Sequence, residues 1–297
     1  MTAPRVALVT HAGLAELTHH DRLLFDALAA RGVATDITVW DDPAVAWSGY
    51  DLVVLRSPWD YSVRRDEFLA WADAVPALAN PATVVRWNTD KRYLRDLAAA
   101  GLPVVPTTWL EPGERVTLPA QGEFVVKPAV SAGSVDTGRY DAADPTQVRL
   151  AAELAGRLLG SGRTVMVQPY LTGIDTAGET ALLFLGGAFS HAIRKGPILG
   201  GPYTGETREH AADHITARTP SDDERRLAER VLAEAARSVP GAGRLLYARV
   251  DLVPGPAGDP VLLELELTEP SLFLADGPGA ADRLAEAVRR EARTGVA

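Results

Sequence analysis

Two apolar runs in the last fifth of the sequence, joined by a turn rich in proline and glycine, constrain the fold most strongly. They read RVDLV (249–253) and VLLELE (261–266), and this pattern predicts a β-hairpin. The hairpin brings Asp251 to the strand beside Glu264 and Glu266, which share one strand face because they are two positions apart. Carboxylates among apolar residues are costly unless a cation neutralises them, and hard oxygen ligands suit Mg²⁺. The alternative is a solvent-facing strand on which acids gather by chance.

The composition narrows the classes of function. A chain of 297 residues exceeds one typical domain, so more than one core is expected. The net charge of −9 argues against a nucleic-acid partner, because phosphate backbones are bound by clustered Lys and Arg. The absence of cysteine excludes disulfides and thiol nucleophiles. No apolar run is long enough to span a membrane and no signal pattern is present, so we expect a cytoplasmic protein with no membrane partner.

The first 85 residues alternate between strand and helix patterns. Short apolar runs predict three strands, and segments with helical periodicity accompany them. The strands are 5–10, 33–40 and 50–57, and the helices are 20–32 and 64–75. This alternation predicts a small parallel α/β layer, in which ligands bind beyond the carboxyl ends of the strands. The loops after Thr10 and Leu55 are therefore expected at a binding edge.

The loop after the third strand, RSPWDY (56–61), concentrates side chains suited to recognition. Arg56 can pair with a carboxylate through its planar guanidinium, and Asp60 can pair with an ammonium. Trp59 and Tyr61 can wall a small pocket. This loop predicts a site for a compact, amino-acid-like substrate. The alternative is an ordinary turn with a half-buried tryptophan.

A lysine and a loop of small residues form the next candidate site. Lys127 ends an apolar strand, and Ser131-Ala132-Gly133-Ser134 follows it closely. Backbone N–H groups of such a loop can point at phosphate oxygens, while the lysine adds a positive charge. Lys91 lies 36 positions before Lys127, near the start of a helix predicted to enter at Asn88 or Thr89. The Walker A pattern is absent, and a plain flexible loop is the alternative.

Further along, VMVQPYL (165–171) predicts a strand that ends in extended backbone. The backbone groups of Tyr170 and Leu171 can read the edge of an adenine. Glu179 begins the next apolar run, 179–195, which predicts two antiparallel strands that turn at two glycines.

Taken in order along the chain, these features resemble the ATP-grasp family. The features are Lys91, Lys127 with its Gly/Ser loop, QPYL (168–171), Glu179 and the acidic hairpin, and the resemblance covers roughly residues 80–275. It implies an α/β (α+β) fold, in which an N-terminal parallel α/β layer is followed by two α+β subdomains that grip ATP. The implied boundaries are 1–85, 86–178 and 179–297.

The resemblance also implies a role for each matching residue in binding ATP. The two lysines would contact the phosphates, the Gly/Ser loop would fold over them, one strand end would line the adenine pocket, and an acid would hold the ribose. In that order the residues are Lys91 and Lys127; Ser131, Gly133 and Ser134; Gln168, Tyr170 and Leu171; and Glu179.

The resemblance assigns the metal and the phosphoryl group to the acidic hairpin. Asp251 and Glu264 would bind Mg²⁺, with Glu264 bridging two ions, and Mn²⁺ is an alternative metal. Arg249 would stabilise the transferring phosphoryl group. The family usually has asparagine where this chain has Glu266, a third metal ligand that adds negative charge beside the γ-phosphate.

Most members of the family use ATP to turn a carboxylate into an acyl phosphate, which a nitrogen nucleophile captures. The resemblance therefore implies a ligase that forms an amide-type C–N bond on a small amino-acid-like carboxylate. The motif LRSPWDY (55–61) also resembles the cyclo-ligases that close O-ureido-D-serine to the antibiotic D-cycloserine. The alternatives are an intermolecular amino-acid or dipeptide ligase and a regulatory nucleotide-binding module without turnover.

Acyl phosphates hydrolyse, so such a ligase needs a lid that excludes water. The loop 196–210, rich in glycine and proline, is the candidate lid. Arg194 beside it is expected to be catalytic, Tyr203 within it to contact substrate, and Lys195 and Arg208 to reach phosphate or acceptor. A homodimer is common among such ligases, so we keep it as an expectation.

Overall fold

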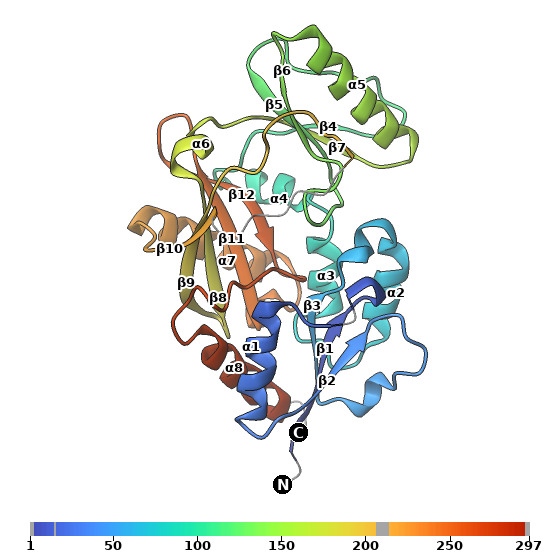
Figure 1. Cartoon of the computed structure of the whole chain (residues 1–297), viewed down its shortest axis with the longest axis vertical. Coiled ribbons are helices and arrows are strands. Elements are labelled where there is room, and N and C mark those ends of the chain that lie inside the picture. The colour runs from blue at the N-terminus through green and yellow to red at the C-terminus, as the bar shows by residue number, and fades with distance from the viewer. Residues whose placement is uncertain (1–2, 15, 206–213, 295–297) are drawn as a thin grey trace.

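The structure is a computed structural model that describes residues 3–14, 16–205 and 214–294. The described strands form three sheets, which Figure 1 shows arranged around the middle of the molecule. Among the described residues, no helix is both long enough and apolar enough to cross a bilayer. The division of the chain near residues 85 and 178 stays a prediction.

The N-terminal sheet has the order β2-β1-β3, and β1 pairs in parallel with both neighbours. Its elements are β1 (Arg5–Thr10), η1 (Ala12–Leu14), α1 (His19–Ala29), β2 (Ala34–Val39), η2 (Trp47–Gly49), β3 (Leu52–Ser57), η3 (Trp59–Val63) and α2 (Arg65–Ala74). Every residue of β3 is buried, as expected for a parallel strand covered on both faces. The predicted α/β layer is confirmed, and its element ends differ from the prediction by three residues or fewer.

The second sheet is antiparallel, with the order β4-β7-β5-β6, and α5 covers one face of it (Figure 1). The bounds are β4 (Thr108–Leu110), β5 (Glu123–Pro128), β6 (Gly138–Asp141), α5 (Pro145–Gly160) and β7 (Val165–Pro169). The helix α5 begins where Asp144 accepts hydrogen bonds from two backbone N–H groups and Pro145 occupies its first turn.

The third sheet is also antiparallel and has the order β10-β9-β8-β11-β12. Its elements are α6 (Gly173–Ala177), β8 (Glu179–Leu185), β9 (Ala188–Lys195), β10 (Ile215–Arg218), α7 (Asp222–Ser238), η5 (Ala242–Arg244), β11 (Tyr247–Pro254), β12 (Pro260–Glu266) and α8 (Ala280–Thr294). A capping box between Ser221 and Glu224 starts α7. The predicted acidic hairpin is confirmed, since β11 and β12 pair Asp251 with Glu264 and Arg249 with Glu266.

Two helices, α3 (Ala82–Asn88) and α4 (Tyr93–Ala99), connect the first sheet to the others. The predicted helix is α4, but it begins at Tyr93 rather than at Asn88 or Thr89. Asn88 ends α3, because its side chain is used elsewhere: its amide group donates to the Leu265 carbonyl (2.8 Å) and accepts from the Leu267 amide (2.7 Å). These bonds fix the end of β12 and the chain that follows it.

The first and third sheets share one apolar core, so the N-terminal layer is packed directly against the third sheet. The helices α1 and α8 lie side by side (Figure 1), and their apolar faces join residues of β1, β3 and β8 in one cluster. Asn80 adds buried bonds, accepting from the Leu246 amide (2.9 Å) and donating to the Leu267 carbonyl (2.6 Å). This packing fixes the edge of the first sheet relative to the acidic hairpin.

Candidate active site

A cavity of about 680 Å³ lies where the three sheets face one another. Strands β3, β5, β7, β9, β11 and β12 all contribute side chains to its wall. The predicted site residues line this cavity with two exceptions, Arg194 and Tyr203. Those that line it are Arg56, Trp59, Asp60, Tyr61, Lys91, Lys127, Ser131, Gly133, Ser134, Gln168, Tyr170, Leu171, Glu179, Arg249, Asp251, Glu264 and Glu266.

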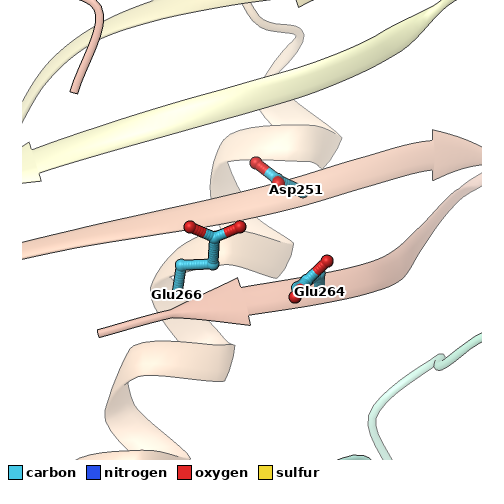
Figure 2. A group of neighbouring side chains, drawn as sticks. All are labelled: Asp251, Glu264 and Glu266. Atoms are coloured by element: carbon cyan, nitrogen blue, oxygen red, sulfur yellow. The ribbon is translucent and has the colours of Figure 1, made fainter. Parts of the chain in front are cut away.

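The acidic hairpin places three carboxylates together on the cavity wall. Figure 2 shows Asp251 on β11 and Glu264 and Glu266 on β12, with their side chains on the same side of the two strands. One oxygen from each lies within 4.8 Å of the others. The alternation of side chains along paired strands produces this arrangement, because Asp251 stands directly opposite Glu264.

Buried cations lie against these acids. Arg249 donates from Nε to Asp251 (2.9 Å) and contacts Glu266, while Lys195 Nζ donates to the other oxygen of Asp251 (2.8 Å) and contacts Glu179. Burial alone would raise the pKa of Asp251, but Arg249 and Lys195 more than offset this and hold that pKa below its ordinary value. Asp251 is therefore ionised across the neutral range.

Two other acids of the cluster, Glu266 and Glu179, are less well neutralised by nearby cations than Asp251 is. Burial raises the pKa of Glu266 to about 8 against the opposing effect of Arg249, and Glu264 adds to the increase. Burial likewise raises the pKa of Glu179 to about 7, against the opposing effect of Lys195. The neighbouring cations therefore do not fully offset the cost of burying these two carboxylates in their charged form. Three hard oxygen donors within reach of one another therefore fit a divalent metal ion, which would supply the missing positive charge.

Lys127 differs from the other cations that line the cavity. It ends β5 and is nearly buried, and among the described residues no hydrogen bond or ion pair reaches its Nζ. Burial lowers the pKa of Lys127 to about 8, and Lys91 contributes to this decrease while Glu264 opposes it. Lys91, by contrast, donates to Glu264 (3.1 Å) and to the Ser131 carbonyl (3.1 Å). Lys127 is thus a buried cation that a phosphate oxygen could contact without displacing a protein partner.

The small-residue loop that follows β5 has a left-handed backbone at several positions. Gly133, Ser134 and Asp136 have φ angles of 61°, 56° and 57°, which non-glycine residues adopt only with local support. Asp136 supplies that support, since its carboxylate accepts from Arg157 (2.8 Å) and Arg163 (2.6 Å). The loop is therefore held in a set conformation beside Lys127.

The structure brings Lys195 into the cavity, whereas Arg194, the residue predicted to be catalytic, is not part of the cavity wall. Neighbouring residues of a strand point to opposite faces, and on β9 it is Lys195 that enters the cavity. Arg194 points away from the cavity and donates to the carbonyls of Ala177 (2.7 Å) and Thr176 (3.0 Å) at the end of α6. A compositional signal favours Lys195, because the chain has only three lysines among 30 basic residues, and all three line the cavity.

Tyr203 is not in the cavity either. Its backbone N–H lies 3.4 Å from the Tyr140 hydroxyl, and its ring packs against the core beneath α5. Gly138 allows this, because a Cβ there would stand 2.7 Å from the Tyr203 nitrogen. The segment instead brings Pro197, Ile198 and Leu199 to the cavity. The last five residues of the predicted lid (206–210), with Arg208, lie outside the described residues.

One end of the cavity is apolar and fits a planar ring. Val125, Leu171, Ile174, Val253 and Leu263 line it. The side chains of two residues predicted there are already bound: Gln168 donates to Thr107 (2.8 Å) and the Tyr170 hydroxyl to Asp175 (2.5 Å). The Tyr170 amide donates to the Glu123 carbonyl (2.8 Å). The Tyr170 carbonyl and the Leu171 amide remain as the strand-end groups for a ligand.

The opposite end of the cavity holds the loop 56–61, and two of its predicted substrate contacts have protein partners. Arg56 donates to Asp21 (2.7 Å) and to the Leu55 (3.2 Å) and Pro270 (3.0 Å) carbonyls. Asp60 accepts from the Trp40 indole (2.9 Å) and pairs with Arg64 (3.4 Å). Both side chains touch the cavity, but their charges are neutralised within the protein.

The residues missed at this end come from a segment with no recognisable motif. Glu269, Ser271, Leu272 and Phe273 follow β12 and line the cavity. Phe273 has a φ of 47°, an uncommon value for an aromatic residue, and such strain is frequent at ligand sites. Positive φ in this segment has no signature in the sequence.

Comparison with known proteins identifies the family. The family described as D-cycloserine synthetase DcsG, N-terminal domain, matches residues 6–83. Cycloserine biosynthesis protein DcsG of Streptomyces lavendulae is 38% identical over 95% of this chain and 97% of its own. A crystal structure of D-cycloserine synthetase DcsG superposes with a TM-score of 0.86 at 36% identity, covering 97% of this chain and 99% of that one.

A RimK domain protein of the ATP-grasp type from Sphaerobacter thermophilus shares the fold. Its TM-score is 0.64 at 18% identity, over 95% of this chain and 98% of that one. The fold and the similarity to D-cycloserine synthetase are those of an ATP-grasp carbon–nitrogen ligase, an enzyme class that uses ATP and a divalent metal. Within that class the chain belongs to the D-cycloserine synthetase family, and it is an ATP-dependent C–N bond-forming ligase.

Proposed function

We propose that this ligase activates the carboxylate of O-ureido-D-serine as an acyl phosphate and closes the ring to D-cycloserine. The observation that carries this proposal is the 38% identity to cycloserine biosynthesis protein DcsG over nearly the full length of both chains. The cavity of about 680 Å³ agrees with it, because one small molecule and ATP fill a volume of that order.

In this proposal ATP lies along the cavity with its adenine in the apolar end. The Tyr170 carbonyl and the Leu171 amide read the edge of the base, and Glu179 lies where the ribose would follow. Lys127 and Lys91 contact the phosphates, with the loop Ser131–Ser134 over them. Lys127 supports this orientation, since it lies two positions beyond the apolar Val125 on β5 and interacts electrostatically with Glu264.

Asp251, Glu264 and Glu266 would hold Mg²⁺, with two ions as the expected number and Mn²⁺ as a substitute. When bound, the metal would neutralise phosphate charge and polarise the γ-phosphoryl group. Glu266 in place of the family's usual asparagine gives the site one more negative charge. This supports tighter metal binding than an amide at that position would give.

The chain's own residues then orient the reaction. Arg249 is buried against Asp251 and Glu266, and its guanidinium faces the cavity where the phosphoryl group transfers. The substrate carboxylate takes that group, the ureido nitrogen bonded to oxygen attacks the acyl carbon, and phosphate leaves. Water then removes the carbamoyl group from this nitrogen as CO₂ and ammonia, and D-cycloserine remains. The segment 197–199 lines the cavity, and a lid formed there would limit hydrolysis of the acyl phosphate.

The homodimer and the cytoplasmic location remain predictions beside this function. Light scattering of the purified enzyme would give its mass in solution, and a value near 31.6 kDa would overturn the dimer. The net charge of −9 supports a small molecule as the partner rather than a nucleic acid.

The test is ADP and phosphate release with Mg-ATP and candidate substrates, with product identified by mass spectrometry. We expect turnover with O-ureido-D-serine alone and D-cycloserine as the product. Turnover that requires two different amino acids would instead establish an intermolecular ligase and overturn ring closure. No release with O-ureido-D-serine, from protein that binds Mg-ATP, would overturn the proposed substrate.

A further inference from the structure

Glu269 is a buried acid of the cavity wall that the ATP site and the metal cluster do not use. It lies three residues beyond the end of β12, and only 9% of its surface is exposed. No ion pair in the described part of the chain involves its carboxylate, whose side-chain partner is the Tyr61 hydroxyl. A buried carboxylate without a cation is costly to keep ionised.

The backbone on both sides of Glu269 is fixed by buried side chains. The Thr268 carbonyl accepts from the Tyr247 hydroxyl (2.9 Å), and the Pro270 carbonyl accepts from Arg56 (3.0 Å). Asn88 accepts from the amide of Leu267 (2.7 Å). Arg56 therefore acts as a positioning residue, because its buried guanidinium links Asp21 of α1 to the segment that carries Glu269.

The Tyr61 side chain is equally well placed. Its ring stacks on Phe68 with centroids 5.2 Å apart and planes at 26°, within the core of the first sheet. Its hydroxyl therefore meets the carboxylate at a set point. Burial raises the pKa of Glu269 to about 7, while Tyr61 and Lys91 act against that rise and Glu264 adds to it. These contacts form a prepared position for a positive charge.

Among the described residues, the other acids at this end of the cavity already have protein partners. Asp60, which the sequence predicts as the ammonium partner, accepts from Trp40 (2.9 Å) and pairs with Arg64 (3.4 Å). Asp21 is bound to Arg56 (2.7 Å). An ammonium group entering beyond the acidic hairpin therefore meets Glu269 as its available counter-ion.

We propose that Glu269 binds the α-ammonium group of the substrate and so selects amino acids over carboxylates that lack an amine. This inference rests on the proposed function in taking an amino-acid-like substrate. It replaces Asp60 with Glu269 as the residue that recognises the ammonium. A charge-assisted hydrogen bond in a buried site provides the selectivity, because the deamino analogue leaves the carboxylate unpaired.

The test compares wild type with Glu269→Gln, using O-ureido-D-serine and its deamino analogue, 3-(ureidooxy)propanoate. We expect Glu269→Gln to raise KM for the amino substrate roughly 10- to 100-fold while KM for ATP stays within about twofold. Titration calorimetry should show that wild type prefers the amino compound and that Glu269→Gln has lost this preference. An unchanged KM, or a preference that survives the substitution, would overturn the inference.

A fall in kcat at constant KM would also overturn it, since that pattern indicates proton transfer rather than ammonium binding. Glu229→Gln, on the exposed face of α7, is the matched control and should behave as wild type. If Glu269→Gln does not fold, Glu269→Asp keeps the charge but shortens its reach, and an unchanged preference for the amine in that variant contradicts the proposal. Wild-type inactivity toward O-ureido-D-serine counts against the proposed substrate, and the same pair of measurements then uses whichever amino acid is turned over.

Discussion

At the scale of a single residue, the buried ammonium of Lys127 destabilises the free protein but prepares the site to bind phosphate. Its ammonium is nearly buried and has no protein partner among the described residues, and its pKa is lowered to about 8. A Lys whose pKa is lower in the folded state than in the unfolded chain destabilises the fold wherever it is charged. Bound phosphate would reverse this cost by supplying the missing negative charge.

We therefore predict that Lys127→Met stabilises the free protein and abolishes ATP turnover. The gain should be about 1–3 kcal/mol below pH 8, because each pKa unit corresponds to about 1.4 kcal/mol. It should fade between pH 8 and about 10.5, where the folded wild type has lost the proton and the unfolded chain has not. Thermal unfolding at several pH values measures it, with and without Mg-ATP.

Mg-ATP should raise the Tm of wild type and leave that of Lys127→Met nearly unchanged. A variant that unfolds more readily than wild type at pH 7 would show that the Lys127 stem packs more favourably than its charge costs. A variant that still turns over ATP at the wild-type rate would remove Lys127 from the phosphate site.

At the scale of elements, the loop 131–137 depends on a clamp at its far end. Asp136 is nearly buried and bound by two arginines, one from α5 and one from the turn before β7, and Arg163 also donates to the Val130 carbonyl (2.9 Å). We predict that Asp136→Asn raises KM for ATP several-fold with a smaller change in kcat. Asparagine tolerates the positive φ but loses the charge that holds both arginines.

Steady-state kinetics with varied ATP would measure this effect. Asp223→Asn, in the exposed first turn of α7, is the control for loss of a carboxylate charge. If Asp136→Asn binds ATP as tightly as wild type, the loop conformation does not depend on the clamp.

The elements that sequence predicts well are those with a local pattern. The strands and helices of the first layer and the acidic hairpin follow from periodicity and spacing. Three-residue β4 and five-residue α6 are too short to carry a period. Strand alternation would have favoured Lys195 over Arg194, but only once the face of β9 that meets the cavity was known.

Contacts at the substrate end of the cavity join residues far apart in the sequence, which explains why the roles of these residues could not be predicted. Arg56 has the chemistry to bind a carboxylate, yet its partners stand 35 and 214 positions away, at Asp21 and Pro270. Glu269 gains its role from Tyr61, 208 positions before it in the sequence and joined to it only by the packing of two sheets. Such pairs depend on tertiary structure, which the local pattern does not encode.

At the scale of the whole molecule, three sheets converge on one charged cavity. The apolar clusters of the first and third sheets are continuous, so the acidic hairpin and the substrate end are held by one packed unit. The second sheet adds Lys127 and the nucleobase end from its own core beneath α5. Arginine is the cation in nearly every surface ion pair, whereas all three lysines line this cavity.

Because all three lysines of the chain line the cavity, lysine acylation reports on the active site. The pKa of Lys127 is lowered to about 8, whereas the acids around Lys91 and Lys195 more than offset burial and raise the pKa of both. Only neutral amines react, so at pH 8 an N-hydroxysuccinimide ester should label Lys127 first, and its rate should fall about tenfold for each pH unit below that. Peptide mass spectrometry of wild type, with the urea-unfolded chain as reference, reads each lysine separately.

Mg-ATP should protect Lys127, because a phosphate contact both covers the amine and keeps it charged. Equal labelling of all three lysines would contradict the assigned electrostatics, and labelling of Lys127 that ATP does not slow would place the phosphates elsewhere in the cavity.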